Sequence, residues 1–195
     1  MRAELCENRT KHDLDQALRR VLEDKPLDQI RVRELTALCG IRRQSFYYHF
    51  PDVHALFSWS LQQEAAALAA RWEGCCTWRQ AVTDLLLHIG ENRSYYRAIL
   101  DCRGEQGLRA LLREPLGALL AQTQDYYRRR CGGVGDRNAE RAQLACGEAL
   151  VFSLAESWIR EPAGQPPETL LAPLEELLRQ GALGRAWNNL AGSGQ

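Results

Sequence analysis

The sequence predicts an all-α protein, and three observations support that class. Apolar residues recur at helical spacing from the first segment onward, in the stripe of Leu14, Ala17, Leu18, Val21 and Leu22. Similar stripes return further along the chain, and breaks that contain glycine or proline separate them. The 195 residues are 45% hydrophobic and 26% charged, which is typical of a soluble globular protein with its own core. We expect about nine helices.

The first helix is expected to begin at Thr10, which has the chemistry of an N-cap, with Asp13 three residues later in a variant of the capping box. Pro26 disfavours helical geometry at the residue before it, so the helix should end just ahead of this proline. Leu27 and Ile30 should enter the core of a small N-terminal head. The residues before Thr10 are expected to fray.

Residues 32–50 are predicted to form two short helices joined by a glycine turn. Gly40 can adopt the positive φ that ends the first of them. Phe46 and Phe50 lie four residues apart, on one buried face of the second. Its other face is polar and its first turn is basic, so the unit is a helix-turn-helix whose second helix suits the major groove of DNA. The buried face of the first helix is expected to carry Val32, Leu35, Leu38 and Cys39.

The same residues carry a family resemblance. The pattern G-I-x-R-Q-S-F-Y-x-H-F at residues 40–50 resembles the recognition helix of the TetR/AcrR family of transcriptional regulators. Residues 26–40 resemble the lead-in to that helix, and D-x-x-x-L-F-x-W at 52–59 resembles the opening of the next one. Residues 42–59 are most similar to the branch that includes dihydroxyacetone-kinase regulators. The resemblance is dense over residues 10–60. It implies a helix-turn-helix DNA-binding domain over 1–52 and a C-terminal bundle for ligand binding and dimerisation over 53–195.

Chemistry and this analogy together suggest roles on the second helix. The Arg43 guanidinium can reach guanine O6 and N7, and Gln44 can read adenine in the same bidentate way. Tyr48 can pack on a thymine methyl or a sugar edge; as an alternative, Tyr47 or Tyr48 is buried in the head. Ser45, Tyr47 and His49 can donate to phosphate oxygens. The candidate DNA-binding residues are Arg33, Arg42, Arg43, Gln44, Ser45, Tyr47, Tyr48 and His49.

The charge of the head agrees with that assignment, although the whole chain is neutral. Twenty-five basic residues balance twenty-five acidic ones over the full length. Residues 25–50 nevertheless carry a net positive charge, because they contain five lysines and arginines but only two acidic residues. Such an excess favours one DNA-facing end on a neutral protein.

The head departs from the family pattern at two positions. Arg31 stands where the family usually has a serine or threonine that caps the following helix, and a guanidinium cannot accept a backbone N–H. We therefore expect a cap weaker by about 1 kcal/mol, unless a phosphate contact compensates. Val53 stands where the family usually has a lysine that contacts phosphate, so the salt dependence of binding should be shallower by about one unit of slope.

The body is expected to contain a long connecting helix, capped by Asp52 and running to about residue 71, followed by amphipathic helices. One stripe covers residues 78–89, and shorter segments cover 95–100 and 105–113. Pro115 is predicted to be the first residue of the next helix, over 116–130. Two C-terminal helices, about 139–160 and 170–180, resemble the family's homodimer interface, which is a four-helix bundle across a two-fold axis. Completion of the monomer core is the alternative role of these helices. The order of the tail beyond residue 183 is left open.

A small-molecule effector is expected in the body, because family members usually bind one there. Cys75 and Cys76 are adjacent, and His88 with Cys102 could ligate zinc, but no zinc-binding spacing occurs. We therefore expect no metal site and no cofactor. Each pocket candidate can equally be an ordinary core or surface residue. They are Trp72, His88, Tyr95, Tyr96, Arg97, Tyr126 and Phe152.

The predicted function is a cytoplasmic regulator that binds double-stranded DNA as a homodimer on a pseudo-palindromic operator. The resemblance implies a repressor, although some members of this branch activate transcription together with a protein partner. The N-terminus lacks the apolar segment of a signal peptide, no membrane span is present, and the seven cysteines form no disulfide framework. The alternative is a protein-interaction adaptor or co-activator on the same fold. No catalytic constellation indicates an enzyme.

Overall fold

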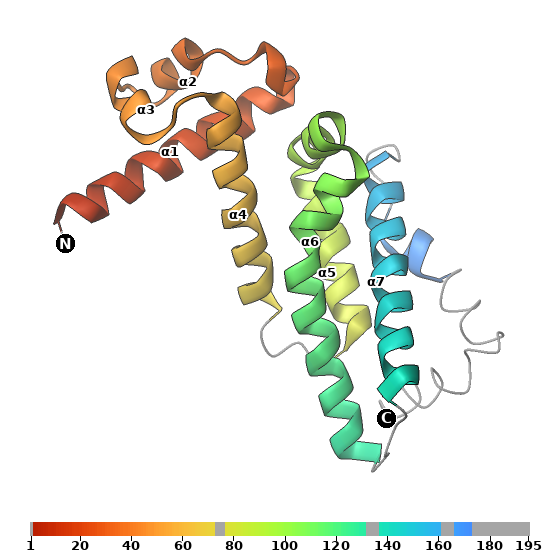
Figure 1. The fold of residues 1–195 in the computed structure, drawn as a ribbon. Helices are drawn as coiled ribbons and strands as arrows, with labels where there is room; N and C mark the ends of the chain where they lie inside the picture. Colours follow the sequence, from red (N-terminus) through yellow and green to blue (C-terminus); the bar gives the residue numbers. More distant parts are fainter. Residues whose placement is uncertain (1, 73–76, 132–136, 161–165, 173–195) are drawn as a thin grey trace. The chain divides into compact units, whose positions relative to one another are not determined.

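The computed structural model describes residues 2–72, 77–131, 137–160 and 166–172, which form helices joined by turns (Figure 1). No strand occurs within these ranges, so the all-α prediction is confirmed for them. A short helical segment covers residues 168–172. The other elements are α1 (Arg2–Asp24), the 3-10 helix η1 (Leu27–Gln29), α2 (Val32–Leu38), α3 (Arg43–His49), α4 (Val53–Arg71), α5 (Trp78–Glu91), α6 (Arg93–Cys131) and α7 (Arg137–Arg160).

Packing divides the chain into two compact units. Unit 1 contains Met1–Arg71 and Asn92–Glu114, and unit 2 contains Trp72–Glu91 and Pro115–Gln195. Unit 1 therefore holds η1 and α1 to α4 together with the first part of α6, whereas unit 2 holds α5, α7 and the second part of α6. This division reflects packing and does not test the predicted boundary between a DNA-binding domain (1–52) and a C-terminal domain (53–195). That boundary stays a prediction.

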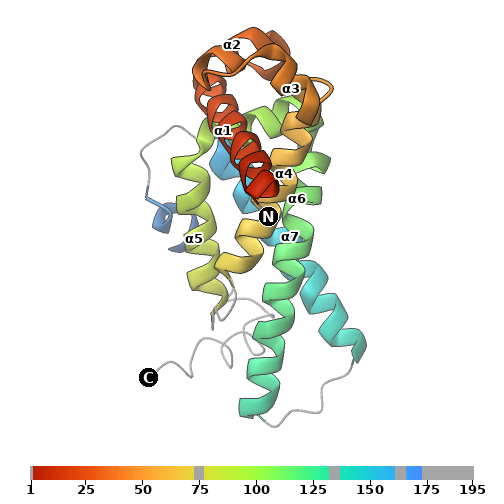
Figure 2. The ribbon, with the colours of Figure 1, turned by 90° about the vertical axis from the view of Figure 1, so that its left-hand side faces the viewer.

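The first helix is longer than the sequence pattern suggested. Residues 2–24 contain no glycine or proline, so nothing local interrupts the helix upstream of Thr10. The prediction of Thr10 as the N-cap, with a frayed segment before it, is therefore wrong. The predicted stripe of α1 is largely confirmed, since Leu14, Ala17, Leu18 and Leu22 are buried. This face packs on α2 and α4 (Figures 1 and 2).

The turn after α2 is built as its sequence requires. Gly40 has a φ of 65°, and its N–H donates to the carbonyl of Ala37 at 3.3 Å. The next N–H, from Ile41, donates to the carbonyl of Thr36 at 3.0 Å, which completes a Schellman motif. Thr36 itself is buried, and its hydroxyl donates to the carbonyl of Val32 at 3.0 Å. Leu38 was predicted on the buried face and is 56% exposed, because that face centres on Leu35 and Thr36 and Leu38 lies beyond its edge.

Replacing Gly40 with alanine should lower the free energy of unfolding by about 1 to 2 kcal/mol, because a side chain at this φ crowds its own backbone. An added Cβ at Gly40 meets no atom within 4 Å, so the loss should be backbone strain alone. Urea denaturation of the full chain measures the effect. Gly117→Ala, at a helical glycine of α6 with room for a Cβ, is the matched control and should be neutral or stabilising. Equal behaviour of the two variants would contradict the prediction.

The connecting helix α4 begins as predicted, but α6 differs from the sequence prediction. Asp52 caps α4, because its Oδ1 accepts the N–H of Ala55 at 2.7 Å. Pro115 lies inside α6 and does not begin a new helix, so that prediction is wrong. A proline inside a helix removes its own N–H donor and crowds the carbonyl four residues before it, yet α6 continues through Pro115. The break occurs at Gly104, whose φ of 60° and ψ of −165° are not helical.

Unit 2 is held by the packing of α5 on α7. Leu85, Leu86 and Ile89 are fully buried on α5, as the predicted stripe requires. The indole of Trp158 on α7 donates from Nε1 to the carbonyl of Leu86 at 2.6 Å. This bond ties the two helices together at the level of the buried leucines. None of the described helices has the length and apolar character needed to span a membrane.

Candidate nucleic-acid interface

The core of the head fixes which side of α3 faces outward. Phe46 and Phe50 are buried, at 0% and 5% exposure, and their rings lie 6.1 Å apart. Phe50 also packs on Trp59 of α4, with 5.8 Å between ring centroids. Because this aromatic face is held by the core, the opposite face of α3 must point to solvent. Both views place α2 and α3 at the same end of unit 1 (Figures 1 and 2).

The predicted DNA-binding side chains occupy that outward face. Tyr47 is 57% exposed and Tyr48 is 76% exposed, so the alternative that one of them is buried is wrong. Ser45 and His49 are half-buried. The remaining candidates are all exposed; they are Arg33, Arg42, Arg43 and Gln44. The structure thus brings the predicted set together on α3 and the adjoining start of α2, while their contacts with DNA stay a prediction.

A hollow lies along each flank of α3. The first has a volume of about 540 Å³ and is lined by residues of η1, α2, α3 and the start of α4. We call it the Arg31 groove, after Arg31, Arg33, Arg43 and Tyr47 in its lining. The second, the Tyr48 groove, has a volume of about 380 Å³. Its lining consists of Arg42, Gln44, Ser45, Tyr48 and His49.

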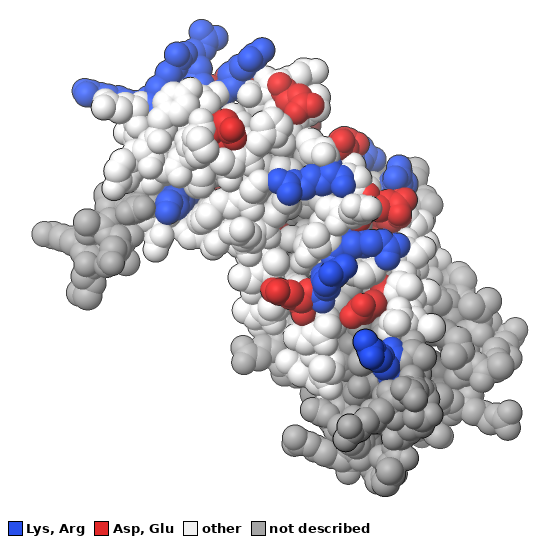
Figure 3. Space-filling model, viewed as in Figure 1, with Lys and Arg blue, Asp and Glu red and all other residues white. Residues whose placement is uncertain are grey.

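Basic side chains gather over the end of unit 1 that holds α2 and α3 (Figure 3). Among the described residues, Arg31, Arg33, Arg42 and Arg43 make no ion pair with an acidic side chain. An accessible guanidinium without an internal partner can bind phosphate and gives up no intramolecular bond in doing so. The local basic excess predicted from the sequence is therefore presented on one surface.

The start of α2 explains how the head accommodates Arg31. Arg31 makes no side-chain cap, as predicted. The carboxylate of Glu34 instead accepts the Arg31 N–H at 3.1 Å, which is the second half of a capping box. Lys25 donates to the same carboxylate at 2.6 Å. This bond makes the largest contribution, and the bond from the Arg31 N–H the next largest, to a Glu34 pKa that lies below its ordinary value. The sequence analysis missed this signal, which was a glutamate three residues after the N-cap.

Val53 cannot make the phosphate contact that a lysine at this position was expected to make. Its side chain is only 8% exposed and belongs to the core of the head. The next residue, His54, is exposed, and its Nε2 lies 3.7 Å from Oδ1 of Asp28 in η1. The first turn of α4 therefore offers an imidazole near a carboxylate at this end of the Arg31 groove.

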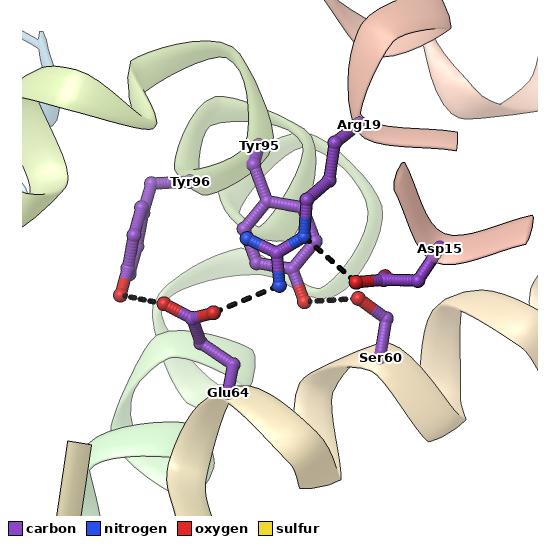
Figure 4. Close-up of polar contacts among 6 residues, drawn as sticks. All are labelled: Asp15, Arg19, Ser60, Glu64, Tyr95 and Tyr96. Carbon is purple, nitrogen blue, oxygen red and sulfur yellow. Dashed lines mark hydrogen bonds and ion pairs between the residues drawn. The ribbon is translucent and has the colours of Figure 1, made fainter. Parts of the chain in front are cut away.

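Two of the predicted pocket residues, Tyr95 and Tyr96, take part in a buried polar network in unit 1 (Figure 4). Arg19 of α1 binds Oδ2 of Asp15 at 3.0 Å and Oε2 of Glu64 at 2.8 Å. The hydroxyl of Tyr96 on α6 donates to the other Glu64 oxygen at 2.8 Å. The network thus joins α1, α4 and α6, and we call it the Arg19 network. The sequence analysis did not identify Asp15, Arg19 or Glu64, because the pairing spans 45 residues.

Tyr95 completes this network from the same turn of α6. Its hydroxyl shares a hydrogen bond of 2.8 Å with Ser60 of α4, and either oxygen can be the donor. The Arg19 guanidinium lies over the Tyr95 ring, 4.0 Å from its centroid, in a cation–π contact. Burial raises the pKa of both Tyr95 and Tyr96 above the ordinary tyrosine value, so both hydroxyls remain protonated. Burial opposes the charge of Arg19, but Asp15 and Glu64 outweigh it and raise the pKa of Arg19.

The remaining pocket candidates are distributed over both units. Trp72 and Phe152 are buried in unit 2, and the indole of Trp72 donates to Asp84 at 3.2 Å. His88 is half-buried in unit 2, and Arg97 is exposed in unit 1. The side chain of Tyr126 lies outside the described residues. The effector pocket therefore stays a prediction.

The cysteine chemistry considered from the sequence lies partly outside the described residues. Cys75 and Cys76 fall in the segment that is not described. Cys39, Cys102 and Cys146 are free thiols, and burial raises the pKa of Cys39 and Cys102. Within the described ranges, no group of three metal-ligating side chains comes together.

No known family model matches the chain. Over 90 residues, 46% of this chain, it is 27% identical to the HTH-type dhaKLM operon transcriptional activator DhaS of Lactococcus lactis subsp. lactis (strain IL1403). The match spans about half the length of that relative, 48%. Its name is that of a transcriptional regulator and not of an enzyme.

The solved structure of the dihydroxyacetone kinase operon activator DhaS is similar in fold. The TM-score is 0.70 at 21% identity, and the alignment covers 87% of this chain and 93% of the other. This likeness confirms the predicted fold class, a helix-turn-helix head followed by a helical bundle.

Proposed function

We propose that the chain is a DNA-binding transcriptional regulator of the TetR/AcrR type, acting in the cytoplasm on a pseudo-palindromic operator. One observation carries the proposal: α3 of the helix-turn-helix presents Arg43, Gln44, Tyr47 and Tyr48 to solvent, while its aromatic face is fixed in the core. These side chains can hydrogen-bond or stack on base edges, and the flanking arginines can bind phosphate. The exposed set matches the chemistry of major-groove recognition.

The similar proteins support the same class of function. DhaS is named as a transcriptional activator in one comparison and as an operon activator in the other, which favours activation over the repression that the family resemblance led us to expect. A reporter fused to the upstream intergenic region decides the sign. Loss of expression on deletion of the gene indicates an activator, whereas a gain indicates a repressor.

We propose a homodimer through the C-terminal helices. On α7, the small residues Ala145, Cys146, Ala149 and Ser153 are exposed, while Ala155 is buried within unit 2. A helix face of small residues lets a second copy approach closely, and a two-fold axis would then set two recognition helices about 34 to 36 Å apart. The second predicted interface helix, 170–180, lies mostly outside the described residues.

Replacing Ala149 with arginine should convert the dimer to monomers, because two copies of a large charge would meet across the axis. We expect the dimer dissociation constant to rise by at least tenfold, or about 1.4 kcal/mol. Sedimentation equilibrium measures it. Ala66→Arg on α4, also an exposed alanine in a helix, is the matched control. A dimer unchanged by Ala149→Arg would place the interface elsewhere.

We also propose that a small-molecule effector acts through the body. Trp72, His88 and Phe152 of unit 2 are retained as candidate contacts, since they combine an apolar lining with polar atoms. The effector would favour one spacing of the two heads over another, which is a shift of population and involves no chemistry.

Fluorescence anisotropy of the purified protein tests DNA binding directly. The labelled duplex is taken from the chain's own upstream intergenic region, beside a scrambled duplex of the same composition, across a salt series. Tight and selective binding to the first duplex supports the regulator. Equal, weak binding to both would contradict it and favour the protein-interaction adaptor instead.

A further inference from the structure

The outer face of α1 carries a pattern of charges that is complementary to itself. We propose that this face binds the same face of a second copy of the chain, in antiparallel orientation, when two dimers occupy neighbouring sites on DNA. This inference rests on the proposed function. It adds an interface between dimers, and with it cooperative binding to DNA, to the homodimer interface proposed for the C-terminal helices.

The first step concerns the exposed residues of α1. Five of them form one stripe along the helix, because they follow one another at intervals of four, three, four and four residues. All five are exposed. The stripe extends over about 22 Å of helix, at about 1.5 Å for each residue. We call this set the α1 stripe; it consists of Arg9, Asp13, Gln16, Arg20 and Asp24.

The second step concerns the order of the charges. From the N-terminal end, the α1 stripe reads basic, acidic, neutral, basic and acidic. An antiparallel second copy, related by a two-fold axis that passes between positions 16 and 17, would place Asp13 opposite Arg20 of the second copy. The same axis would place Arg9 opposite Asp24 of the second copy. Every charge of the stripe would therefore meet an opposite charge, as a two-fold contact between identical surfaces requires.

The third step concerns what these charges do within one chain. Arg9 and Asp13 are four residues apart, as are Arg20 and Asp24, so each couple can form an ion pair within the helix. In the part of the chain that the structure describes, none of the four takes part in an ion pair. The α1 stripe therefore presents accessible charges, and a second copy can bind them without breaking an internal ion pair.

The fourth step concerns a hollow beside the middle of the stripe, between α1 and α2. Its volume is about 210 Å³, which is below the roughly 300 to 1,000 Å³ of sites that bind small molecules. Asp13, Gln16 and Arg20 line it from α1, and Leu38, which is 56% exposed, lines it from α2. A second α1 lying along the stripe would cover this leucine. Burial of apolar surface would then add to the ion pairs.

The contact is expected to be too weak to hold two dimers together in solution. Each copy contributes little more than one helix face, and ion pairs that stay in contact with water contribute little individually. Two dimers bound at neighbouring sites are held at a high effective concentration of one for the other, because the same duplex carries both. The same contact should then strengthen binding of the second dimer.

The test uses the full-length protein and fluorescence anisotropy with two labelled duplexes. One is the upstream duplex, and the other carries the same sequence twice, with the spacing between the copies varied over one helical turn of about 10 base pairs. At one of these spacings, the wild-type chain should bind each site of the tandem duplex about fivefold or more tightly than the single duplex. This ratio of affinities should fall towards one as salt is raised, because salt screens exposed ion pairs.

Charge reversal tests whether the α1 stripe makes the contact. Asp13→Arg would place two arginines opposite each other, and Arg20→Asp would place two acids there, so each variant should lower the ratio towards one. The double variant Asp13→Arg with Arg20→Asp keeps the net charge and again sets opposite charges across the axis, so it should restore the ratio. Glu91→Arg is the matched control, at an exposed acid that ends α5 in unit 2, and should leave the ratio unchanged. Circular dichroism should show that every variant is folded.

Three results would overturn this inference alone, given a wild-type chain that binds the single duplex. The first is a wild-type ratio of one at every spacing, and the second is a wild-type ratio in both single variants. The third is a double variant that stays at one while both single variants have lost the ratio, because the stripe would then contact DNA or another protein and not itself. A wild-type chain that binds neither duplex would overturn the proposed function and this inference with it.

Discussion

Replacing Glu64 with leucine is expected to lower the free energy of unfolding by about 3 to 5 kcal/mol, because it removes one of the two carboxylates that bind the Arg19 guanidinium and the acceptor of a buried hydroxyl. Glu64 is 5% exposed and accepts bonds from both Arg19 and Tyr96. Its loss would leave the Arg19 guanidinium with Asp15 alone and the Tyr96 hydroxyl without this acceptor. Chemical denaturation followed by far-UV circular dichroism measures the change.

A double-mutant cycle separates the ion pair from the rest of the Arg19 network. Arg19→Met alone leaves two acidic side chains, Asp15 and Glu64, without the cation that both of them bind. The double variant Arg19→Met with Glu64→Leu removes both charges and fills the site with apolar atoms. Its loss of stability should be well below the sum of the single losses, with a coupling energy of about 1 to 3 kcal/mol. Additive losses would show that the two side chains act independently.

Two further variants set the scale of this prediction. Tyr96→Phe removes one hydroxyl at nearly constant volume and should cost about 1 to 3 kcal/mol, since a buried acceptor loses a donor. Glu105→Leu, at an exposed glutamate of α6, should change stability by less than about 0.5 kcal/mol. A cost below about 1 kcal/mol for Glu64→Leu would mean that water replaces the missing carboxylate.

The Arg19 network also shows why part of unit 1 could not be predicted from the sequence. Short-range patterns predicted the stripe of α1, the turn at Gly40 and the aromatic face of α3, because each depends on residues close together in the chain. The pairing of Arg19 with Glu64 depends on how α1 crosses α4, and no local period encodes that geometry. The polar partners of Tyr95 and Tyr96 were not predicted for the same reason, because Ser60 and Glu64 lie 35 and 32 residues away from them in the chain.

Helix ends were predicted well only where one residue decides them. The positive φ of Gly40 and the Asp52 cap are such cases. At Pro115, a residue that usually begins or ends helices was outweighed by the good helix-forming sequence on both sides. The exposed face of α3 was predictable because Phe46 and Phe50 define the opposite face. Its use in binding DNA depends on a partner that the chain alone does not contain.

Arg43→Ala is expected to abolish selective DNA binding while leaving most nonspecific binding intact. A bidentate arginine–guanine pair contributes about 1 to 3 kcal/mol of discrimination, or about 2 to 6 kcal/mol for the two heads of a dimer. The upstream duplex should therefore lose roughly 30-fold to 20,000-fold in affinity. The scrambled duplex should lose only the charge contribution. Anisotropy with both duplexes at one fixed salt concentration measures the ratio.

Arg33→Ala is the matched control for this prediction, because Arg33 is an arginine of the same groove that lies on α2 and not on the recognition helix. A phosphate contact strengthens binding to every sequence, so Arg33→Ala should lower both affinities and preserve their ratio. If Arg43→Ala also preserved the ratio, Arg43 would hold phosphate, and Gln44 with Tyr48 would have to read the bases. The ratio between duplexes, and not the affinity alone, therefore distinguishes a base-reading arginine on α3 from a positioning arginine on α2.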